Sequence, residues 1–256
     1  MRQTVPDWTI KAGRCFLVLA FLLGLSGSSV KVETQEKAIL QPEQIIEAFR
    51  KVSTGNLSDA VEEATGQRGA MFHDMKPIFK TKIVGRAYTA VLRRIFKNDT
   101  RTYPNYALQI LDEAPAGSIL VYVLEDGLEI AGIGNLMATT AKVRELAGAV
   151  IDGGARDIEE IAEIGFPVFS RSVTPVTSVG KLVSVAKNEP VLCGGIRVRP
   201  GDYLMGDWDG VVVVPAEVAP RVVELLHQYD EKETKMIPLI KEKKSMLKAL
   251  ELYNRY

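Results

Sequence analysis

Apolar residues recur at helical spacing in five stretches that begin after residue 40. The spacing predicts helices over residues 41–52, 59–64, 105–113, 136–146 and 158–164. Local signals agree with these positions. Ser58 is suited to cap the second helix, with Glu62 near the reciprocal capping-box position, and Pro115 and Gly117 end the third. Gly165 ends the fifth helix.

Runs of apolar and β-branched residues predict strands over residues 83–91, 119–124, 149–152 and 167–169. From residue 119 to 169 strands and helices alternate, which is typical of a parallel sheet covered by helices. Residues 181–214 have no helical period and several turn signals, so they predict strands joined by tight turns. The chain from Ala216 onward is charged and helical in pattern, with an expected interruption at Pro238.

No linker, low-complexity tract or internal repeat divides the chain after about residue 40. The pattern therefore predicts one α/β domain over residues 40–256, with a helical C-terminal tail.

The first 29 residues have a different pattern. Arg2, Lys11 and Arg14 precede an apolar run over residues 15–25, and small residues follow. This is the pattern of a secretory signal peptide, and 11 apolar residues are too few for a membrane span, which needs roughly 20. We expect residues 1–29 to be removed and the protein to be exported, either periplasmic or secreted, with no stable membrane span. An uncleaved membrane anchor is the alternative.

Composition narrows the class of protein. The chain has 256 residues, of which 46% are hydrophobic, so it can fill a substantial core and is neither disordered nor collagenous. Basic and acidic residues number 32 each; without residues 1–29 they number 29 and 31. The chain therefore lacks the excess of positive charge that is expected of a nucleic-acid-binding protein. Of the two cysteines, only Cys193 would remain, so the mature chain forms no internal disulfide.

Two segments at predicted strand ends carry candidate chemistry. The first runs from Gly132 through Gly134, Asn135, Leu136 and Met137 into a helix. Backbone N–H groups at such a helix start favour an anion such as a carboxylate or enolate. The alternative is structural, with the glycines making a tight turn and Asn135 capping the helix.

The glycine pair also raises the possibility of a dinucleotide site, since it follows a predicted strand. The third glycine of that fingerprint is missing, because Met137 stands there, and only Asp152 or Asp157 is placed to bind a ribose.

The second segment covers residues 152–157, Asp-Gly-Gly-Ala-Arg-Asp. Arg156 can hold a carboxylate through two parallel hydrogen bonds, and Asp157 is an oxygen ligand of the type that Mg²⁺ takes. Gly153 and Gly154 allow close approach of the backbone. The alternative is again structural, with Asp157 capping the next helix and Arg156 forming a surface ion pair.

Together the two segments suit a small 2-oxo acid. Its carboxylate and keto oxygen can chelate a metal while N–H groups receive the charge that develops on enolisation.

The same residues resemble a known family. Residues 134–137 and 152–157 look like the signature of the 4-hydroxy-4-methyl-2-oxoglutarate aldolases, which share a family with the regulator of ribonuclease activity A. The resemblance extends over most of the mature chain, through residues 53–60, 83–89, 200–202 and 207–215.

The resemblance implies a layered β/β/α fold of the swivelling-domain type and a homotrimer. It implies that Gly134, Asn135, Leu136 and Met137 bind the pyruvoyl part of the substrate, together with Arg156. Asp157 would ligate Mg²⁺ or Mn²⁺. The implied reaction is cleavage of 4-hydroxy-4-methyl-2-oxoglutarate or a similar 2-oxo acid to pyruvate, with oxaloacetate decarboxylation as a second activity.

One position departs from the family pattern. The aldolases commonly carry Asp or Glu where this chain has Asn135, and an amide adds no charge to the metal's water shell. The aldolases also use an acidic residue from the C-terminal helix of the adjacent subunit, for which Glu231 and Glu233 are both candidates. A non-catalytic ligand- or protein-binding member of the family is the alternative function.

Overall fold

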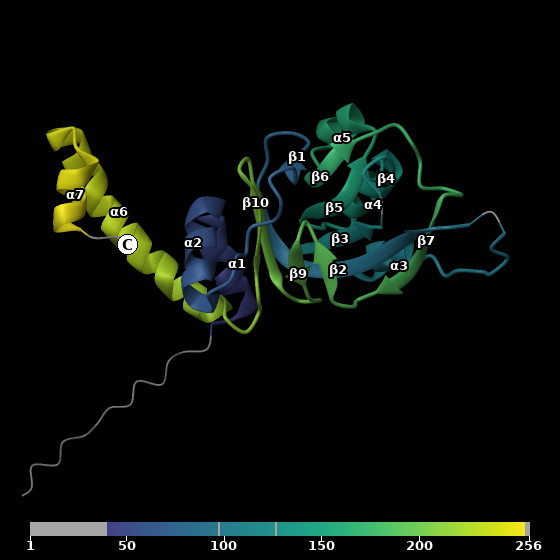
Figure 1. Ribbon diagram of the computed structural model, residues 1–256, viewed down its shortest axis with the longest axis horizontal. Helices are drawn as coiled ribbons and strands as arrows, with labels where there is room; N and C mark the ends of the chain where they lie inside the picture. Colours follow the sequence, from purple (N-terminus) through teal and green to yellow (C-terminus); the bar gives the residue numbers. More distant parts are fainter. Residues whose placement is uncertain (1–39, 97, 126, 254–256) are drawn as a thin grey trace, which may run out of the picture. The chain divides into compact units, whose positions relative to one another are not determined.

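The computed structural model of the protein describes residues 40–96, 98–125 and 127–253 (Figure 1). The predicted signal segment, residues 1–29, lies outside the described residues. Within those three ranges, no helix is both long and apolar enough to cross a membrane.

Nine of the described strands form one sheet, and two more form a separate hairpin, β8–β9. The sheet order is β1-β6-β5-β3-β2-β10-β11, with β4 also paired to β5 and β7 to β2. The bounds are β1 Lys76–Pro77, β2 Ile83–Arg94, β3 Ser118–Leu124, β4 Ala131–Ile133, β5 Gly148–Ala155, β6 Val168–Val173, β7 Leu182–Lys187, β8 Val191–Cys193, β9 Ile196–Val198, β10 Tyr203–Asp207 and β11 Gly210–Val214.

The middle of the sheet is parallel, as the alternating strand and helix pattern predicts. β2, β3, β5 and β6 run parallel to one another, and β4 runs parallel to β5. Six of the seven β3 side chains are buried, which explains why this strand is a continuous apolar run with no alternation of polar residues.

The sheet is nearly closed by the segment that precedes β1. β1 pairs with β6 at one edge, while the Met71 backbone N–H donates to the Val211 carbonyl of β11 at the other edge, at 2.9 Å. Val213 donates to the Gly69 carbonyl at 3.0 Å. A nearly closed sheet leaves few unpaired backbone groups at its edges.

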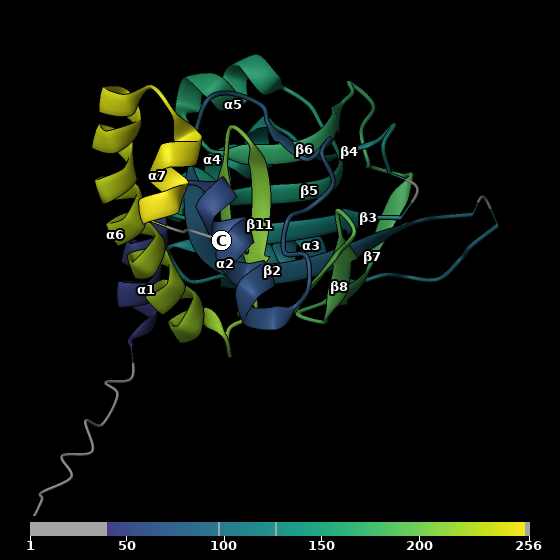
Figure 2. The same ribbon diagram turned by 60° about the vertical axis from the view of Figure 1, so that its left-hand side comes forward.

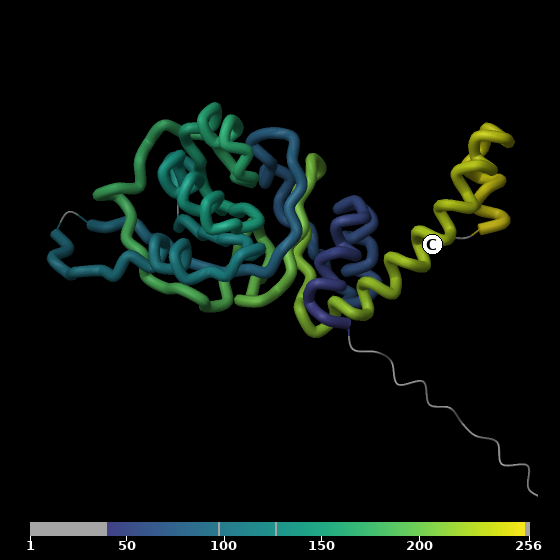
Figure 3. Tube along the Cα trace, turned by 180° about the vertical axis from the view of Figure 1, so that it is seen from behind, coloured from purple at the N-terminus to yellow at the C-terminus, as the bar shows by residue number. Residues whose placement is uncertain are grey.

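Seven helices lie along the described residues. They are α1 Pro42–Arg50, α2 Thr54–Thr65, α3 Tyr106–Glu113, α4 Asn135–Val143, α5 Ile158–Ile164, α6 Ala219–Lys243 and α7 Met246–Leu252. α3, α4 and α5, which are labelled beside the parallel strands in Figure 2, share one apolar core with those strands. α1, α2 and the first half of α6 pack together against β10 and β11 (Figure 3).

A third core lies between these two and includes the β8–β9 hairpin with buried Cys193. Burial raises the pKa of the Cys193 thiol well above its ordinary value. The result is a mixed α/β single domain with β/β/α layering and C-terminal helices, as the sequence predicts.

Two predictions about the helices are wrong. Ser53, and not Ser58, caps α2, because the Ser53 hydroxyl accepts from the Asn56 backbone N–H at 3.2 Å. Pro238 does not interrupt α6, which continues to Lys243. Pro238 is exposed, so water can satisfy the Thr234 carbonyl that loses its helical hydrogen bond.

Candidate functional site

The two predicted segments meet where β4 and β5 end. β4 is a short strand that the sequence pattern does not reveal, and it pairs with residues of β5 beyond the end of β3. The Arg156 backbone N–H donates to the Ile133 carbonyl at 3.1 Å. This hydrogen bond places Gly134, directly after β4, beside Arg156, directly after β5. The site therefore lies at the carboxyl ends of parallel strands, where open α/β sheets bind ligands.

β5 also continues further than predicted, through Ala155. Gly153 and Gly154 lie within the strand and not in a loop. A Cβ at Gly153 would lie 2.8 Å from Leu124, and one at Gly154 would lie 2.8 Å from the Ile130 carbonyl oxygen. These glycines permit close packing of β5 against neighbouring residues of the same chain.

Asp157 turns its carboxylate back toward the start of α4. Its backbone is in the left-handed region, with φ of 55° and ψ of 45°, which is uncommon outside glycine. Oδ2 of Asp157 accepts from the Asn135 backbone N–H at 2.9 Å and lies 3.6 Å from Nε of Arg156. It does not cap its own helix, so the capping-box alternative is wrong. Strain of this kind is concentrated at functional sites.

Gly134 is required by the closeness of this arrangement. A Cβ at this position would lie 2.6 Å from Oδ2 of Asp157 and 2.9 Å from Nε of Arg156. Any larger residue would displace one or both of these side chains.

Asn135 does not cap α4, because Gly134 occupies the N-cap position, where it has no side chain to accept a hydrogen bond, and Asn135 is the first residue of the helix. The side-chain Oδ1 of Asn135 instead accepts from the Thr139 hydroxyl at 3.1 Å. The backbone N–H of Asn135 donates to Asp157. The N–H groups of Leu136 and Met137 follow in the first turn of α4, where backbone N–H groups have no acceptor within the helix.

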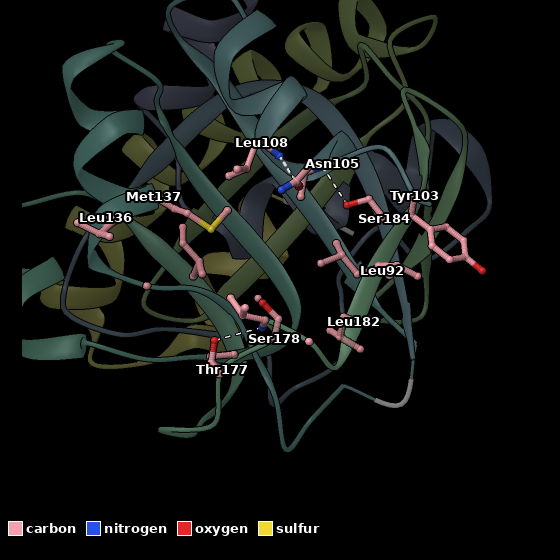
Figure 4. Close-up of a pocket in the computed structure, with 18 of the residues that line it drawn as sticks. Leu92, Tyr103, Asn105, Leu108, Leu136, Met137, Thr177, Ser178, Leu182 and Ser184 are labelled. Atoms are coloured by element: carbon pink, nitrogen blue, oxygen red, sulfur yellow. Dashed lines mark hydrogen bonds between the residues drawn. The ribbon is translucent and has the colours of Figure 1, made fainter. Parts of the chain in front are cut away.

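A pocket of about 520 Å³ opens beside these residues (Figure 4). Gly134, Leu136, Met137 and Arg156 line it; Asn135 and Asp157 are not among its lining residues. The remaining lining residues come from β2, β4, α3, β7 and the loops before α3 and β7. Figure 4 shows Leu92 and Leu182 across the pocket from Met137, and Leu108 beside Asn105.

Asp157 offers the site a single carboxylate for a metal. Among the described residues, no group of three or more His, Cys, Asp or Glu side chains could hold an ion. Mg²⁺ often binds through one or two carboxylates and keeps several waters, so one half-exposed aspartate is compatible with it. A closed structural zinc site has no counterpart in this part of the chain.

A second arginine cluster lies on the opposite face of β5, and sequence reasoning missed it. Arg171 donates to Asp74 at 2.9 Å and to Asp152 at 2.9 Å, and its guanidinium lies over the Phe72 ring. The other oxygen of Asp152 accepts from the Gly194 backbone N–H at 2.7 Å. Asp152 is thereby occupied, which removes it as a ribose ligand.

Arg171 changes the pKa of its partner Asp74. Hydrogen bonding to Arg171 holds the pKa of Asp74 below its ordinary value. No sequence signal pairs Arg171 with Asp74, because the two residues are 97 positions apart.

Two other motifs of the family resemblance have a structural function here. Asp207 accepts from the Thr54 hydroxyl at 2.6 Å and from the Thr54 backbone N–H at 3.0 Å. These bonds tie the start of α2 to the β10–β11 turn. Burial raises the pKa of Asp207, but the hydrogen bonds from Thr54 and Asp209 and the charge of Lys82 outweigh it and lower the pKa overall.

Both acidic residues considered for a neighbouring site lie on α6. Glu231 is exposed, whereas Glu233 is half-buried and accepts from the Asn56 side-chain amide at 3.3 Å.

The fold and the site together describe an α/β protein in which the N-terminus of a helix lies beside an Arg-Asp pair. Comparison with known proteins identifies the class. A sequence model of the RraA-like (Aldolase/RraA) family matches residues 54–213. The chain belongs to this family.

Three relatives show how the similarity is distributed. An uncharacterized protein of Methanocaldococcus jannaschii is 33% identical over 192 residues, which are 73% of this chain and 85% of the relative. A putative 4-hydroxy-4-methyl-2-oxoglutarate aldolase of Halalkalibacterium halodurans is 31% identical over 175 residues, which are 66% of this chain and 76% of the relative. The crystal structure of Streptomyces coelicolor RraAS2, described as an unusual member of the RNase ES inhibitor RraA family, matches with a TM-score of 0.67 and 26% identity. That match covers 76% of this chain and 96% of RraAS2.

Proposed function

We propose that the protein is a divalent-metal-dependent aldolase that cleaves 4-hydroxy-4-methyl-2-oxoglutarate or a similar 2-oxo acid to pyruvate. Oxaloacetate decarboxylation is a second activity, since loss of CO₂ leaves the same pyruvate enolate. The observation that carries this proposal is the meeting of Arg156, Asp157 and the start of α4, of which Arg156 and the α4 residues Leu136 and Met137 line a pocket. The relative from Halalkalibacterium halodurans supports it by its name.

Each residue has a defined task in this proposal. The Arg156 guanidinium holds the substrate carboxylate and orients the keto group toward Asp157. The N–H groups of Leu136 and Met137 point toward the negative charge that develops on the keto oxygen. Asp157 would hold Mg²⁺ or Mn²⁺, which when bound supplies polarisation of the keto group.

Asn135 lowers the negative charge at this site relative to an acidic residue. The Asn135 backbone N–H is hydrogen-bonded to Asp157, so an acidic residue at this position would add a second carboxylate to the residue that contacts Asp157. We expect weaker metal binding in this chain than in relatives with Asp or Glu there.

The test is pyruvate release from 4-hydroxy-4-methyl-2-oxoglutarate and from oxaloacetate, with and without Mg²⁺. We expect turnover that depends on the metal and falls at least a hundredfold in Arg156→Ala. Arg221→Ala removes an equally charged residue from the exposed face of α6 and serves as the control. Absence of metal-dependent turnover, or full activity of Arg156→Ala, would contradict the proposal.

A non-catalytic binding protein is the second candidate, and Asn135 is the observation that favours it. RraAS2, a structural neighbour of this chain, is described as an unusual member of an RNase inhibitor family. Asn135→Asp separates the two functions. A large gain in both metal affinity and turnover would indicate that the natural chain has an altered site and acts mainly by binding.

The proposal includes a homotrimer. Apolar side chains beside the site are exposed in the isolated chain: Leu136 by 84%, Val179 by 79% and Val173 by 65%. Exposed apolar patches of this kind mark interaction surfaces. Light scattering during size-exclusion chromatography tests this, with a mass near three times that of the chain expected.

We also propose export through residues 1–29, followed by their removal. Intact mass of the protein purified from its natural compartment tests this. A full-length mass would indicate the uncleaved anchor instead.

A further inference from the structure

A second pocket, of about 700 Å³, lies between α2, the β8–β9 hairpin and the segment that follows β11. Among the residues that the structure describes, it shares no lining residue with the pocket beside Arg156. Its charged lining residues are Arg68, Arg197, Arg199, Asp202 and Glu217, so three arginines accompany two acidic residues and the pocket is net positive. The proposed reaction at Arg156 and Asp157 makes no use of this pocket.

Both acidic side chains of the second pocket are paired with the same arginine. Nη2 of Arg199 lies 3.3 Å from Oδ1 of Asp202 and 2.6 Å from Oε2 of Glu217. The backbone also engages Asp202, since Oδ2 accepts from the Arg199 N–H at 2.8 Å and Oδ1 accepts from the Ala216 N–H at 3.1 Å. Within residues 40–96, 98–125 and 127–253, Arg68 and Arg197 form no ion pair.

Arg68 is held in place by a backbone carbonyl. Its Nη2 donates to the Met71 carbonyl at 2.8 Å, and the other N–H groups of a guanidinium remain as donors. The next residue, Phe72, donates its backbone N–H to the Gly194 carbonyl in the β8–β9 turn, at 2.8 Å. Arg68 is therefore tied to the same hairpin that carries Arg197.

Arg197 enters the pocket from β9. It is exposed and lies directly opposite Leu192 in the β8–β9 pairing, and both residues line the pocket. The two turn residues, Gly194 and Gly195, have φ of 54° and 78°, and positive values at both positions are typical of a tight two-residue turn. The Gly194 N–H donates to Asp152 at 2.7 Å, so the turn is anchored to β5. A fixed backbone lowers the entropic cost of binding a ligand at Arg197.

Most of the remaining lining is apolar. Val61 and Val213 are buried, whereas Arg68 and Arg197 are exposed. The half-buried residues Ile196, Pro215 and Val218 complete this apolar surface. The pocket thus combines two arginines that have no carboxylate partner with apolar surface, as small-molecule sites commonly do.

We propose that the second pocket binds a small molecule that has a carboxylate or phosphate head on an apolar body. The head lies between Arg68 and Arg197, where an oxyanion offsets the repulsion between two positive charges and accepts charge-assisted hydrogen bonds. The apolar body gains from burial against Val61 and Val213. Because the pocket is net positive by one charge, a carboxylate fits better than a doubly charged phosphate. This inference goes beyond the aldolase reaction and does not depend on it.

The first test is titration calorimetry with 2-naphthoate and with 2-naphthamide, which has the same body and an uncharged head. We expect 2-naphthoate to bind at least tenfold more tightly. Arg68→Gln and Arg197→Gln each remove one positive charge and should each weaken its binding at least tenfold. Arg144→Gln is the matched control, because Arg144 also donates to a backbone carbonyl, that of Ala114 at 3.5 Å, and lines neither pocket.

The second test separates this pocket from the one beside Arg156. Arg156→Ala should weaken the binding of pyruvate and leave the affinity for 2-naphthoate unchanged. Arg68→Gln should have the opposite effect on the two ligands. Loss of pyruvate release with 2-naphthoate binding intact would contradict the aldolase proposal alone, so failure of the one proposal can be distinguished from failure of the other.

The third test identifies the head with 2-naphthyl phosphate, which we expect to bind more weakly than 2-naphthoate. Tighter binding that is lost in Arg68→Gln and Arg197→Gln would support the pocket and assign it to phosphate esters. Absence of binding by both anions would overturn the inference. Equal binding of 2-naphthamide would overturn it too, as would anion binding that Arg156→Ala abolishes or that the Arg68 and Arg197 variants leave unchanged.

Discussion

Two arginines near β5 stand beside aspartates, but the two faces of the strand use these pairs differently. Arg171 makes direct hydrogen bonds of 2.9 Å to Asp74 and Asp152, and its side chain is 21% exposed. Arg156 lies 3.6 Å from Asp157, is 38% exposed and faces a pocket.

The difference separates a structural cluster from a site that is prepared for a ligand. In the Arg171 cluster all three guanidinium nitrogens donate to Asp74 or Asp152, so the group is committed to structure within the chain. Arg156 makes no hydrogen bond of normal length to Asp157, which leaves its donors available. The same two residue types thus stabilise the fold on one face and are available for chemistry on the other.

The largest expected effect is the loss of activity in Asp157→Asn, which Asp152→Asn should not share. Asp157→Asn keeps the shape of the side chain and an acceptor for the Asn135 N–H, but it removes the charge that would hold a metal. We expect metal-dependent pyruvate release to fall by a factor on the order of a thousand, with little change in stability. Asp152→Asn should do the opposite, lowering stability while folded molecules remain active. Equal loss of activity in both variants would contradict the assignment.

The next largest effect is on the free energy of unfolding, in which Arg171→Ala and Arg156→Ala should differ. Arg171→Ala leaves two partly buried carboxylates without their partner, so we expect the free energy of unfolding to fall by about 2–3 kcal/mol. Arg156→Ala should lower it by less than about 0.5 kcal/mol, because that pair is long and half-exposed. Urea denaturation of both variants measures this contrast. If Arg156→Ala proved the more destabilising, the site residues would have to be regarded as structural.

A smaller effect is expected at Gly134. Gly134→Ala adds a methyl group that displaces Asp157 or Arg156, so we expect kcat/KM to fall about tenfold, in line with the cost of misplaced catalytic groups. Gly55→Ala is the matched control, because a Cβ there would lie 3.6 Å from the Ser53 hydroxyl, an ordinary contact. Unchanged kinetics in Gly134→Ala would show that the close approach is not needed.

The smallest effect appears in acid. The pKa of Asp74 is lowered in the folded state, so its interaction with Arg171 stabilises fully above the unfolded pKa of about 3.9 and is lost as pH falls through the lower folded value. Stability of the natural chain should therefore decline more steeply below pH of about 4 than that of Arg171→Ala. Thermal melts between pH 5 and pH 3, at about half-unit steps, measure the difference. Parallel curves would indicate that Arg171 does not set this pKa.

Much of the fold could be predicted because local signals and tertiary structure agree. The helix over residues 158–164 has its predicted bounds, since apolar spacing and Gly165 define both ends. The parallel order of β3, β5 and β6 follows from the alternation of strands and helices. β4 was missed because its three residues are too short a run to show a period.

The candidate site was predictable in composition but not in geometry. Residues 134–137 and Arg156 could be chosen from residue type and position. That Asp157 accepts from the Asn135 backbone depends on its left-handed conformation and on the pairing of β4 with β5, neither of which is a local signal. Ser53 likewise replaces Ser58 as a cap because Thr54 is held by distant Asp207.

The most direct test of the central claim is a crystal structure of the protein with Mg²⁺ and pyruvate. We predict that the pyruvate carboxylate lies on the Arg156 guanidinium, that its keto oxygen faces the first turn of α4, and that the metal contacts the Asp157 carboxylate. Pyruvate or Mg²⁺ bound elsewhere, with the Arg156 and Asp157 side chains left empty, would contradict the account.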